Sequence, residues 1–277
     1  MGNPLLLNFC NTAPLSYKNQ IVTIHDLAAI EHPEWFSRPF STYYRWLLPR
    51  IAHSALRVVT VSEWSKKRIL ERFRIEASKV EVIPPDVNQN LIAAAHEPMN
   101  GLHEGFVLMV GNLDPRKQFH RAIESLLPLA RQRGLKIVLA GSKSPSFGKV
   151  VLPADDNFIW LDAPNDGQLA WLYSNCQALV HPSSYEGFSL VPHEATAFGA
   201  LLVLSDIPVH RAENLSHAIY FSAKEMASLP TAVSECISRS KPPKNHVSTA
   251  EVNGSAVQWL AMVNGILESG TMPTFRS

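Results

Sequence analysis

The run Glu186-Gly-Phe-Ser-Leu-Val-Pro-His-Glu194 follows the apolar segment Gln177-Ala-Leu-Val-His-Pro182, and together they predict a strand, a tight loop and a helix. Gly187 suits the turn, and Pro192 is typical of the first turn of a helix. A loop of this kind directs the backbone N–H groups of the helix start toward an anion. The carboxylates at the two ends of the run can accept hydrogen bonds from hydroxyl groups. Phosphate and hydroxyl groups together are the chemistry of a nucleotide sugar.

A second run, which ends in two basic residues, is Gly111-Asn-Leu-Asp-Pro-Arg-Lys117. It follows the apolar segment Phe106-Val-Leu-Met-Val110. Arg116 and Lys117 therefore lie at the carboxyl end of a predicted strand, where open α/β sheets bind ligands. Cations at a helix start oppose the helix dipole, so anion binding explains their placement better than a structural role. The Arg fork and the Lys point charge are suited to neutralise a diphosphate leaving group without a metal.

The composition excludes several classes of protein. A chain of 277 residues can bury one large core or two modest ones. A net charge of +1 offers no electrostatic basis for nucleic-acid binding. The three cysteines are far apart in the sequence, which argues against a disulfide framework or a zinc site and suits a reducing compartment. No apolar run approaches the roughly 20 residues of a membrane span, and the first residues do not read as a signal peptide. These features predict a cytoplasmic protein.

The chain from residue 106 onward alternates apolar strands with helices. Strands are predicted at 106–110, 135–140, 158–161, 177–181, 201–205 and 218–221. Helical segments include 119–133, which ends at Gly134, and 168–174. Near-continuous apolar strands that alternate with helices predict a parallel sheet covered on both faces. This part is expected to be a complete doubly wound domain.

The first part of the chain has a sparser pattern, typical of the rear half of a Rossmann-like domain. Strands are predicted at 5–9, 21–25, 57–61 and 80–83, and helices at 41–56 and 63–73. A linker is predicted at 96–103 and a second polar gap at 238–246, with a last helix near 249–268. The expected domains are therefore 1–98, 99–245 and a terminal helical segment, 246–277.

Other catalytic patterns are missing from the sequence. The chain contains no Gly-x-Gly-x-x-Gly and no Gly-x-Ser-x-Gly, which argues against a dinucleotide oxidoreductase and a serine hydrolase. Asp155-Asp156 is not an Asp-x-Asp metal site, and no His-Glu-x-x-His occurs. We therefore expect neither a metal nor a cofactor.

The motifs resemble those of family 4 glycosyltransferases. The family run Glu-Gly-Phe-Gly-Leu-Pro-x-x-Glu is matched at 186–194, with Ser189 in place of the second glycine and Val191 preceding Pro192. The Val-Gly-Asn-Leu-Asp-Pro-Arg-Lys-Asn run is matched through Lys117, with Gln118 replacing Asn. Thr23-Ile-His-Asp26, Val61-Ser-Glu-Trp-Ser65 and Val82-Ile-Pro84 also match. The resemblance implies an α/β fold of GT-B type, with an incomplete N-terminal Rossmann-like domain and a complete C-terminal one. The last helix would pack back on the N-terminal domain.

The resemblance also implies roles for individual residues. Glu194 would accept hydrogen bonds from the ribose hydroxyls, and Glu186 would contact the transferred sugar. Arg116 and Lys117 would stabilise the departing diphosphate. His25 would lie near the donor sugar, although a histidine at this position is also often a structural residue. The remaining donor-binding positions implied are Gly111, Asn112, Gly187, Phe188, Ser189 and Leu190.

The implied activity is a retaining, metal-independent transfer from a nucleoside diphosphate sugar, with GDP-mannose as the first candidate. The acceptor would be a saccharide or a lipid-linked saccharide at the cytoplasmic face of a membrane. The family's N-terminal Gly-rich loop has no match here. The N-terminal sheet should therefore have an unpaired edge, to be covered by self-association or another chain. Two alternatives stay open: a nucleotide-sugar-binding protein without catalysis, and a GT-B epimerase.

Three other assignments are local. Asp26 and Ser62 are predicted to cap the helices that follow them. For Tyr43-Tyr-Arg-Trp-Leu-Leu-Pro-Arg50, packing of an apolar stripe in the core is the favoured interpretation, and contact with a membrane surface is the alternative.

Overall fold

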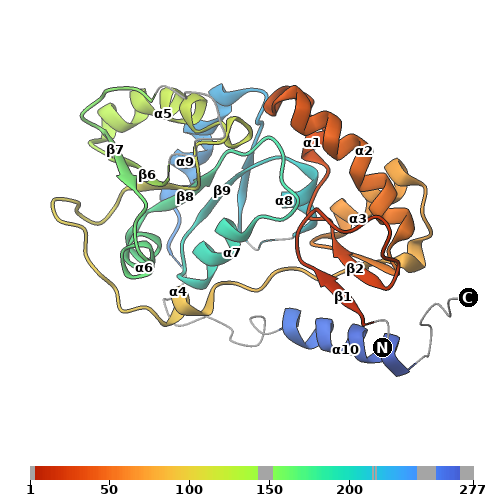
Figure 1. The fold of residues 1–277 in the computed structure, drawn as a ribbon. Helices are drawn as coiled ribbons and strands as arrows, with labels where there is room; N and C mark the ends of the chain where they lie inside the picture. The colour runs from red at the N-terminus through yellow and green to blue at the C-terminus, as the bar shows by residue number, and fades with distance from the viewer. Residues whose placement is uncertain (1–3, 143–151, 214, 216, 242–253, 269–277) are drawn as a thin grey trace, which may run out of the picture. The chain divides into compact units, whose positions relative to one another are not determined.

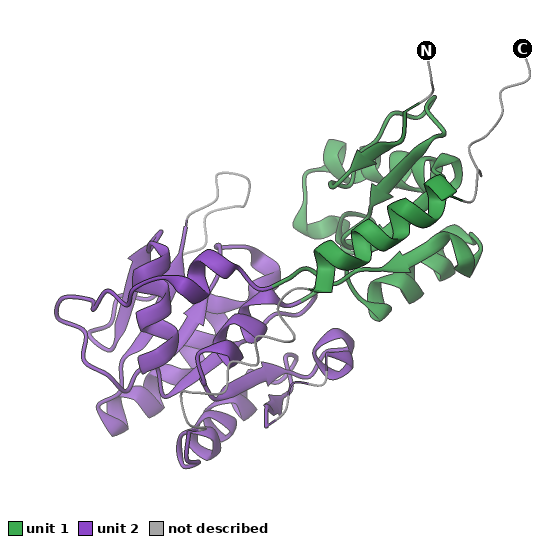
Figure 2. Cartoon of the chain, turned by 90° about the horizontal axis from the view of Figure 1, so that it is seen from below, with its two compact units in different colours: residues 1–86, 186–188, 253–277 green, residues 87–185, 189–252 purple. Residues whose placement is uncertain are grey.

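The computed structural model describes residues 4–142, 152–213, 215, 217–241 and 254–268, and the chain forms two compact units (Figures 1 and 2). Unit 1 is built from described residues of 1–86, 186–188 and 253–277, and unit 2 from those of 87–185 and 189–252. The division falls after Asp86 rather than at residue 98. The reason is that Leu91 of α4 (Gln89–Ala93) belongs to a hydrophobic cluster of unit 2.

Unit 2 contains a six-stranded parallel sheet in the order β10-β9-β8-β5-β6-β7. Its strands are β5 (Val107–Val110), β6 (Ile137–Gly141), β7 (Phe158–Asp162), β8 (Ala178–His181), β9 (Leu202–Ser205) and β10 (Ile219–Phe221). The order runs outward from β5 through β6 on one side and through β8 on the other. This is the doubly wound topology expected from the sequence, and its switch point lies between β5 and β8.

Helices cover both faces of this sheet. One face carries α5 (Phe119–Arg133) and α9 (Leu229–Ile237), and the other carries α4, α6 (Asp166–Asn175) and α7 (Leu190–Ala197). Local signals set the helix ends. Gly134 ends α5 with a φ of 64°, and Asn165 begins α6 with a capping box completed by Gln168. The short α8 (Pro208–Ala212) and η4 (Met226–Ser228) also belong to this unit.

Unit 1 contains a four-stranded parallel sheet in the order β1-β2-β3-β4. Its strands are β1 (Leu6–Asn8), β2 (Gln20–Thr23), β3 (Arg57–Thr60) and β4 (Val80–Val82). One face is covered by α1 (Ala28–Glu31), α2 (Arg38–Ser54) and α3 (Glu63–Phe73), with the turns η1 (Pro33–Trp35) and η2 (Ala77–Lys79) beside them in the chain. Among the described residues, β1 pairs only with β2 and is an edge strand with exposed Leu6 and Leu7.

The last helix, α10 (Gly254–Glu268), packs within unit 1 on the other face of the same sheet. Met262 and Ile266 lie in one cluster with Ile21 and Val59 of the sheet. The Ser255 amide donates to the Asp86 side chain at 3.1 Å. The expected start of this helix near 249, and most of the polar gap 238–246, lie outside the described residues.

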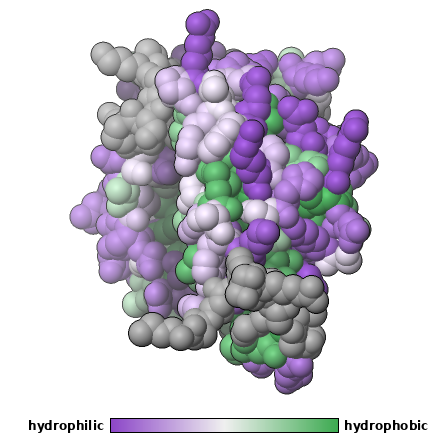
Figure 3. All heavy atoms as spheres, turned by 45° about the vertical axis from the view of Figure 1, so that its right-hand side comes forward, coloured by the Kyte–Doolittle hydropathy of each residue, from purple (hydrophilic) through white to green (hydrophobic). Residues whose placement is uncertain are grey.

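The two sides of α2 have opposite environments. Leu47, Leu48 and Ile51 are buried in the core of unit 1, so the favoured interpretation of its apolar stripe is confirmed for these residues. Tyr43 and Trp46 of the same segment are exposed. Figure 3 shows one side of the molecule, on which apolar residues reach the surface between hydrophilic ones.

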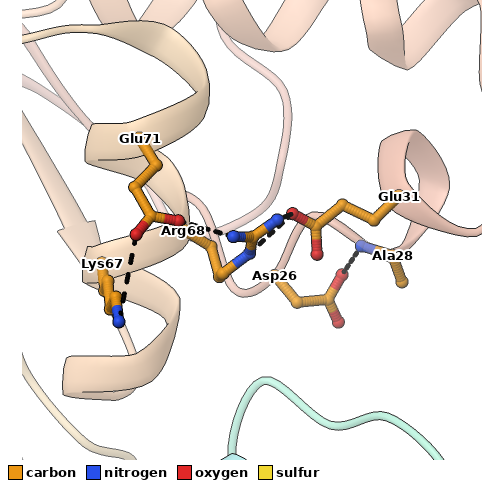
Figure 4. Close-up of polar contacts among 6 residues, drawn as sticks. All are labelled: Asp26, Ala28, Glu31, Lys67, Arg68 and Glu71. Atoms are coloured by element: carbon orange, nitrogen blue, oxygen red, sulfur yellow. Dashed lines mark hydrogen bonds and ion pairs between the residues drawn. The ribbon is translucent and has the colours of Figure 1, made fainter.

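Polar contacts join α1 to α3 in unit 1 (Figure 4). The Asp26 carboxylate accepts the Ala28 amide at 2.9 Å. Asp26 lies one residue before the N-cap Leu27, so it binds the start of α1 but is not its N-cap as predicted. Arg68 of α3 donates to Glu31 of α1 at 2.6 Å and to Glu71 at 2.5 Å. No helix in the described part of the chain is long and apolar enough to span a bilayer.

Candidate active site

The loop that follows β5 and the loop that follows β8 meet at the switch point of unit 2. The loop after β5 contains η3 (Pro115–Lys117), and the loop after β8 contains Ser184. The Ser184 amide and hydroxyl donate to the carbonyl oxygen of Arg116 at 2.8 and 3.0 Å. These contacts fix the turn that carries Arg116 and Lys117 against the segment that leads into the glutamate run. Ligands of doubly wound proteins bind at this position.

Asp114 orients the basic turn. One of its carboxylate oxygens accepts the Arg116 amide at 2.9 Å, and the other accepts the Arg116 Nε at 2.7 Å. The Asp114 side chain is only 6% exposed, so the ion pair is largely desolvated. Asp114 was not predicted as a functional residue, although an Asp that precedes Pro at the start of a turn is a local capping signal.

The strand ends beside this turn approach each other very closely. A Cβ atom at Gly141 would lie 2.1 Å from the Gly111 carbonyl oxygen, so no other residue fits at the end of β6 without a backbone shift. Gly111 itself has a φ of 144°, and the Asn112 side chain accepts a hydrogen bond from Ser142 at 2.8 Å. Gly111 and Asn112, both predicted to bind the donor, therefore lie at the carboxyl edge of β5.

Glu194 projects from α7 and is held by a buried tyrosine. Tyr173 of α6 is fully buried, donates its hydroxyl to Glu194 Oε2 at 2.8 Å and stacks on Phe198. Burial raises the pKa of Glu194 above its ordinary value, whereas the hydrogen bond from Tyr173 acts in the opposite direction. Among the described residues, Glu194 Oε1 has no hydrogen-bond partner. One carboxylate oxygen is therefore positioned by the protein, and the other is available to a ligand.

The start of α7 differs from the expectation. The Ser189 amide, predicted to hold a phosphate or sugar oxygen, donates instead to Glu213 Oε1 at 2.8 Å. His193 Nε2 lies 3.7 Å from the other oxygen of this buried carboxylate. A carboxylate is favourable at a helix start, which explains the contact. Glu213 was missed because it lies 24 positions from Ser189 in the sequence. Leu190, the other amide predicted here, is the first residue of α7.

The remaining predicted residues are His25 and the segment Glu186–Phe188. By their contacts, all of them belong to unit 1. A Cβ atom at Gly187 would lie 2.5 Å from the His25 carbonyl oxygen, so glycine is required here by close packing. The Ser62 hydroxyl donates to the Gly187 carbonyl at 2.6 Å, and it also accepts the Ser65 amide at 3.0 Å as the predicted cap of α3. Ser62 thus has a second role that its sequence position did not indicate.

His25 lies two residues beyond the end of β2, rather than at the end of a strand as expected. Its Nε2 is 2.9 Å from the Phe9 carbonyl oxygen, and its amide donates to Asn11 at 2.8 Å. Because a carbonyl only accepts, this geometry assigns the proton to Nε2. Glu186 is buried within the same unit.

The two buried cysteines of unit 2, Cys176 and Cys236, are not placed as reactive thiols. Burial raises the pKa of Cys176 to about 12 and that of Cys236 to about 11, so both thiols stay protonated at neutral pH. Within the described ranges, no three His, Cys, Asp or Glu residues are grouped as metal ligands.

Two family models match the chain. The model for glycosyl transferases group 1 matches residues 98–250, more than half of the sequence, and that for glycosyltransferase family 4 matches residues 6–90. The chain belongs to the group 1 glycosyltransferases. The two matches meet near the division between the two units.

Curated relatives of this glycosyltransferase include several mannosyltransferases. The O-antigen chain mannosyltransferase RfbU of Salmonella typhimurium is 29% identical over 80% of this chain and 62% of its own length. The O-antigen chain mannosyltransferase B of Escherichia coli is 23% identical over 70% of this chain and 55% of its own length. The chain thus spans less than two thirds of either relative.

Solved structures show that the glycosyltransferase has the GT-B fold. WaaG, a glycosyltransferase involved in lipopolysaccharide biosynthesis, matches with a TM-score of 0.66 and 14% identity, over 94% of this chain and 77% of its own. Sucrose-phosphate synthase from Thermosynechococcus elongatus matches with a TM-score of 0.59 and 19% identity, over 91% of this chain and 68% of its own.

Proposed function

We propose that this glycosyltransferase moves a sugar from a nucleoside diphosphate sugar to a saccharide or lipid-linked acceptor, with retention of configuration. The observation that carries the proposal is the meeting of the Arg116 turn and the Ser184 loop at the switch point of unit 2. Mannose is the first candidate for the sugar and GDP for the nucleotide, because the relatives include O-antigen mannosyltransferases. The reaction would take place in the cytoplasm, at the inner face of a membrane.

Each site residue has a proposed task. Arg116 and Lys117 neutralise the diphosphate, Glu194 accepts hydrogen bonds from ribose hydroxyls, and Glu186 contacts the transferred sugar. His25, with its proton on Nε2, is proposed to lie near that sugar. The bond between the anomeric carbon and the phosphate oxygen breaks with its electron pair on the oxygen, and an oxocarbenium-like carbon forms. The acceptor oxygen then bonds to that carbon, and its proton passes to the departing diphosphate.

Nucleotide selectivity and metal dependence test this proposal directly. Binding to the folded state raises the unfolding temperature, so a thermal-shift panel of UDP, GDP, ADP and TDP should show a preference, with GDP first. We expect the same shift with and without EDTA, because Arg116 and Lys117 supply the positive charge. No stabilisation by any of the four nucleotides would contradict the proposed function. A shift that vanishes with EDTA and returns with magnesium or manganese would contradict the metal-independent part of it.

Tyr173→Phe is predicted to weaken nucleotide binding about fivefold at neutral pH, because it removes the hydrogen bond that orients the Glu194 carboxylate. The phenylalanine ring keeps the stacking on Phe198. The substitution also removes an interaction that lowers the pKa of Glu194, so this pKa should rise further. As pH falls, the carboxylate is then protonated earlier, and the variant should lose affinity at a higher pH than the parent. Calorimetric titrations of the same nucleotide across a pH series check both effects.

A suitable control for that series is Tyr220→Phe, whose hydroxyl donates to the His210 carbonyl at 3.2 Å on another part of unit 2. Its pH dependence should follow that of the parent. If Tyr173→Phe binds nucleotide like the parent at every pH, Tyr173 has no positioning role.

The edge strand β1 bears on the oligomeric state of the chain. Because β1 has an open edge among the described residues, we expect the chain to self-associate at this edge. Leu7→Lys places a charge on the edge and should shift the chain toward monomer in analytical ultracentrifugation, whereas Thr42→Lys on α2 should not. A parent chain that stays monomeric at every concentration measured would rule out this expectation.

A further inference from the structure

The outer side of α2 combines aromatic and basic side chains that the proposed site does not use. Phe40, Tyr43 and Trp46 are 42, 51 and 45% exposed. They occur at three-residue intervals, and their rings form a continuous series with Phe36 and Tyr44. Large aromatic side chains at these exposures leave a substantial apolar area in contact with water.

The charge on this helix is of one sign. Arg38, Arg45 and Arg50 are exposed, and α2 contains no Asp or Glu. The Arg50 guanidinium lies 4.6 Å from the centre of the Trp46 ring and donates to the Trp46 carbonyl at 2.6 Å. An arginine stacked on a tryptophan can keep its charge at the level of lipid headgroups while the ring enters the interface. The nearest acidic residue along the chain, Glu34, lies in the η1 turn and is hydrogen-bonded to His32.

A second exposed apolar group provides a contrast. Val257, Leu260 and Leu267 of α10 are also exposed, but the described part of that helix carries no Lys or Arg. The described helix α10 therefore has no positive charge to attract an anionic surface, whereas α2 combines positive charge with interfacial aromatics. The buried side of α2, with Leu47, Leu48 and Ile51, holds the helix on unit 1 and leaves the aromatic side outward.

We propose that the outer side of α2, consisting of Arg38, Phe40, Tyr43, Arg45, Trp46 and Arg50, docks on an anionic phospholipid surface. Arginines near such a surface are attracted by its negative potential, and Tyr and Trp prefer the boundary between headgroups and acyl chains. The helix lies along the surface and does not span the bilayer. This docking deepens the proposed function, because it would bring the enzyme to a lipid-linked acceptor, but the surface itself does not depend on catalysis.

Vesicle co-sedimentation of the full chain tests the proposal. We expect binding to vesicles with about one third phosphatidylglycerol and little binding to pure phosphatidylcholine, with the difference reduced by salt. Tyr43→Ser/Trp46→Ser and Arg45→Glu/Arg50→Glu should each lower binding to the anionic vesicles about tenfold or more. Val257→Ser/Leu260→Ser on α10 is the matched control and should bind within about twofold of the parent. The four α2 side chains replaced in these two double variants are all exposed, and measured unfolding temperatures verify that the variants are folded.

The outcomes separate this proposal from the transferase function. Nucleotide binding by the α2 variants should equal that of the parent, and Glu194→Ala should bind vesicles like the parent. Equal binding of the parent to neutral and anionic vesicles, or unchanged binding by both α2 variants, would overturn the docking surface. The proposal is also overturned if the α2 variants alter only the oligomeric state or only the binding of an RNA oligonucleotide, since the occupant would then be a second copy or a nucleic acid. Failure of the nucleotide panel with intact vesicle binding would reject only the proposed function.

Discussion

Arg116→Ala should lower sugar transfer about 100-fold or more, because the guanidinium is proposed to stabilise negative charge on the departing diphosphate. The same substitution should reduce the preference for a nucleoside diphosphate over the corresponding monophosphate by about tenfold, since a charge-assisted contact to the terminal phosphate is lost. Calorimetry with the preferred nucleotide of the panel measures this second effect even in a preparation that does not turn over.

The structure adds a stability effect that must be separated from the catalytic one. Arg116 Nε is bonded to Asp114, whose carboxylate is largely buried. Removing the guanidinium leaves that carboxylate with one donor fewer, so the variant should also unfold at a lower temperature. Arg116→Lys restores a positive charge without the bidentate fork and should recover part of the diphosphate preference.

Arg133→Ala is a matched control, because Arg133 is an exposed arginine at the end of α5, away from the switch point. It should leave both the transfer rate and the diphosphate preference unchanged. A transfer rate of Arg116→Ala within a factor of two of the parent, with an unaltered diphosphate preference, would reject the proposed role.

Glu194→Ala should weaken nucleotide binding by about 1–3 kcal/mol, or roughly 5- to 150-fold, and should slow the chemical step less than it weakens binding. The reason is that the substitution removes the carboxylate that Tyr173 orients, and with it the proposed hydrogen bonds to the ribose hydroxyls. Titration of the ribonucleotide and its 2′-deoxy analogue assigns the contact. The parent should discriminate between the two sugars, and the variant should do so much less.

Glu124→Ala, an exposed glutamate on α5, is the control for this series and should bind both nucleotides like the parent. Unchanged nucleotide affinity of Glu194→Ala in calorimetry would remove Glu194 from the site.

The pKa of Glu194 also sets a direction for the pH dependence of nucleotide binding by the parent. Because burial raises this pKa, affinity should begin to fall at a pH above the ordinary range for a glutamate as the solution is acidified.

Elements with strong local signals were predictable from the sequence. The helices expected at 63–73 and 119–133 occur with those bounds, since Ser62 caps one and Gly134 ends the other. All ten strands occur within about two residues of their predicted positions, because apolar runs between turn residues are typical of buried parallel strands. The short α1 and α4 were not predicted, since four or five residues give too short a pattern to recognise.

The sequence by itself determined the alternation of strands and helices, the doubly wound topology and the placement of Arg116 and the glutamate run at strand ends. Each of these depends on neighbouring residues or on the periodicity of a short segment. The partners of the site were decided only by tertiary structure. Tyr173 reaches Glu194 across 21 positions, and Glu213 reaches the Ser189 amide across 24. Side chains from different elements meet only when helices pack on the sheet, so no pattern within one element indicates such pairs.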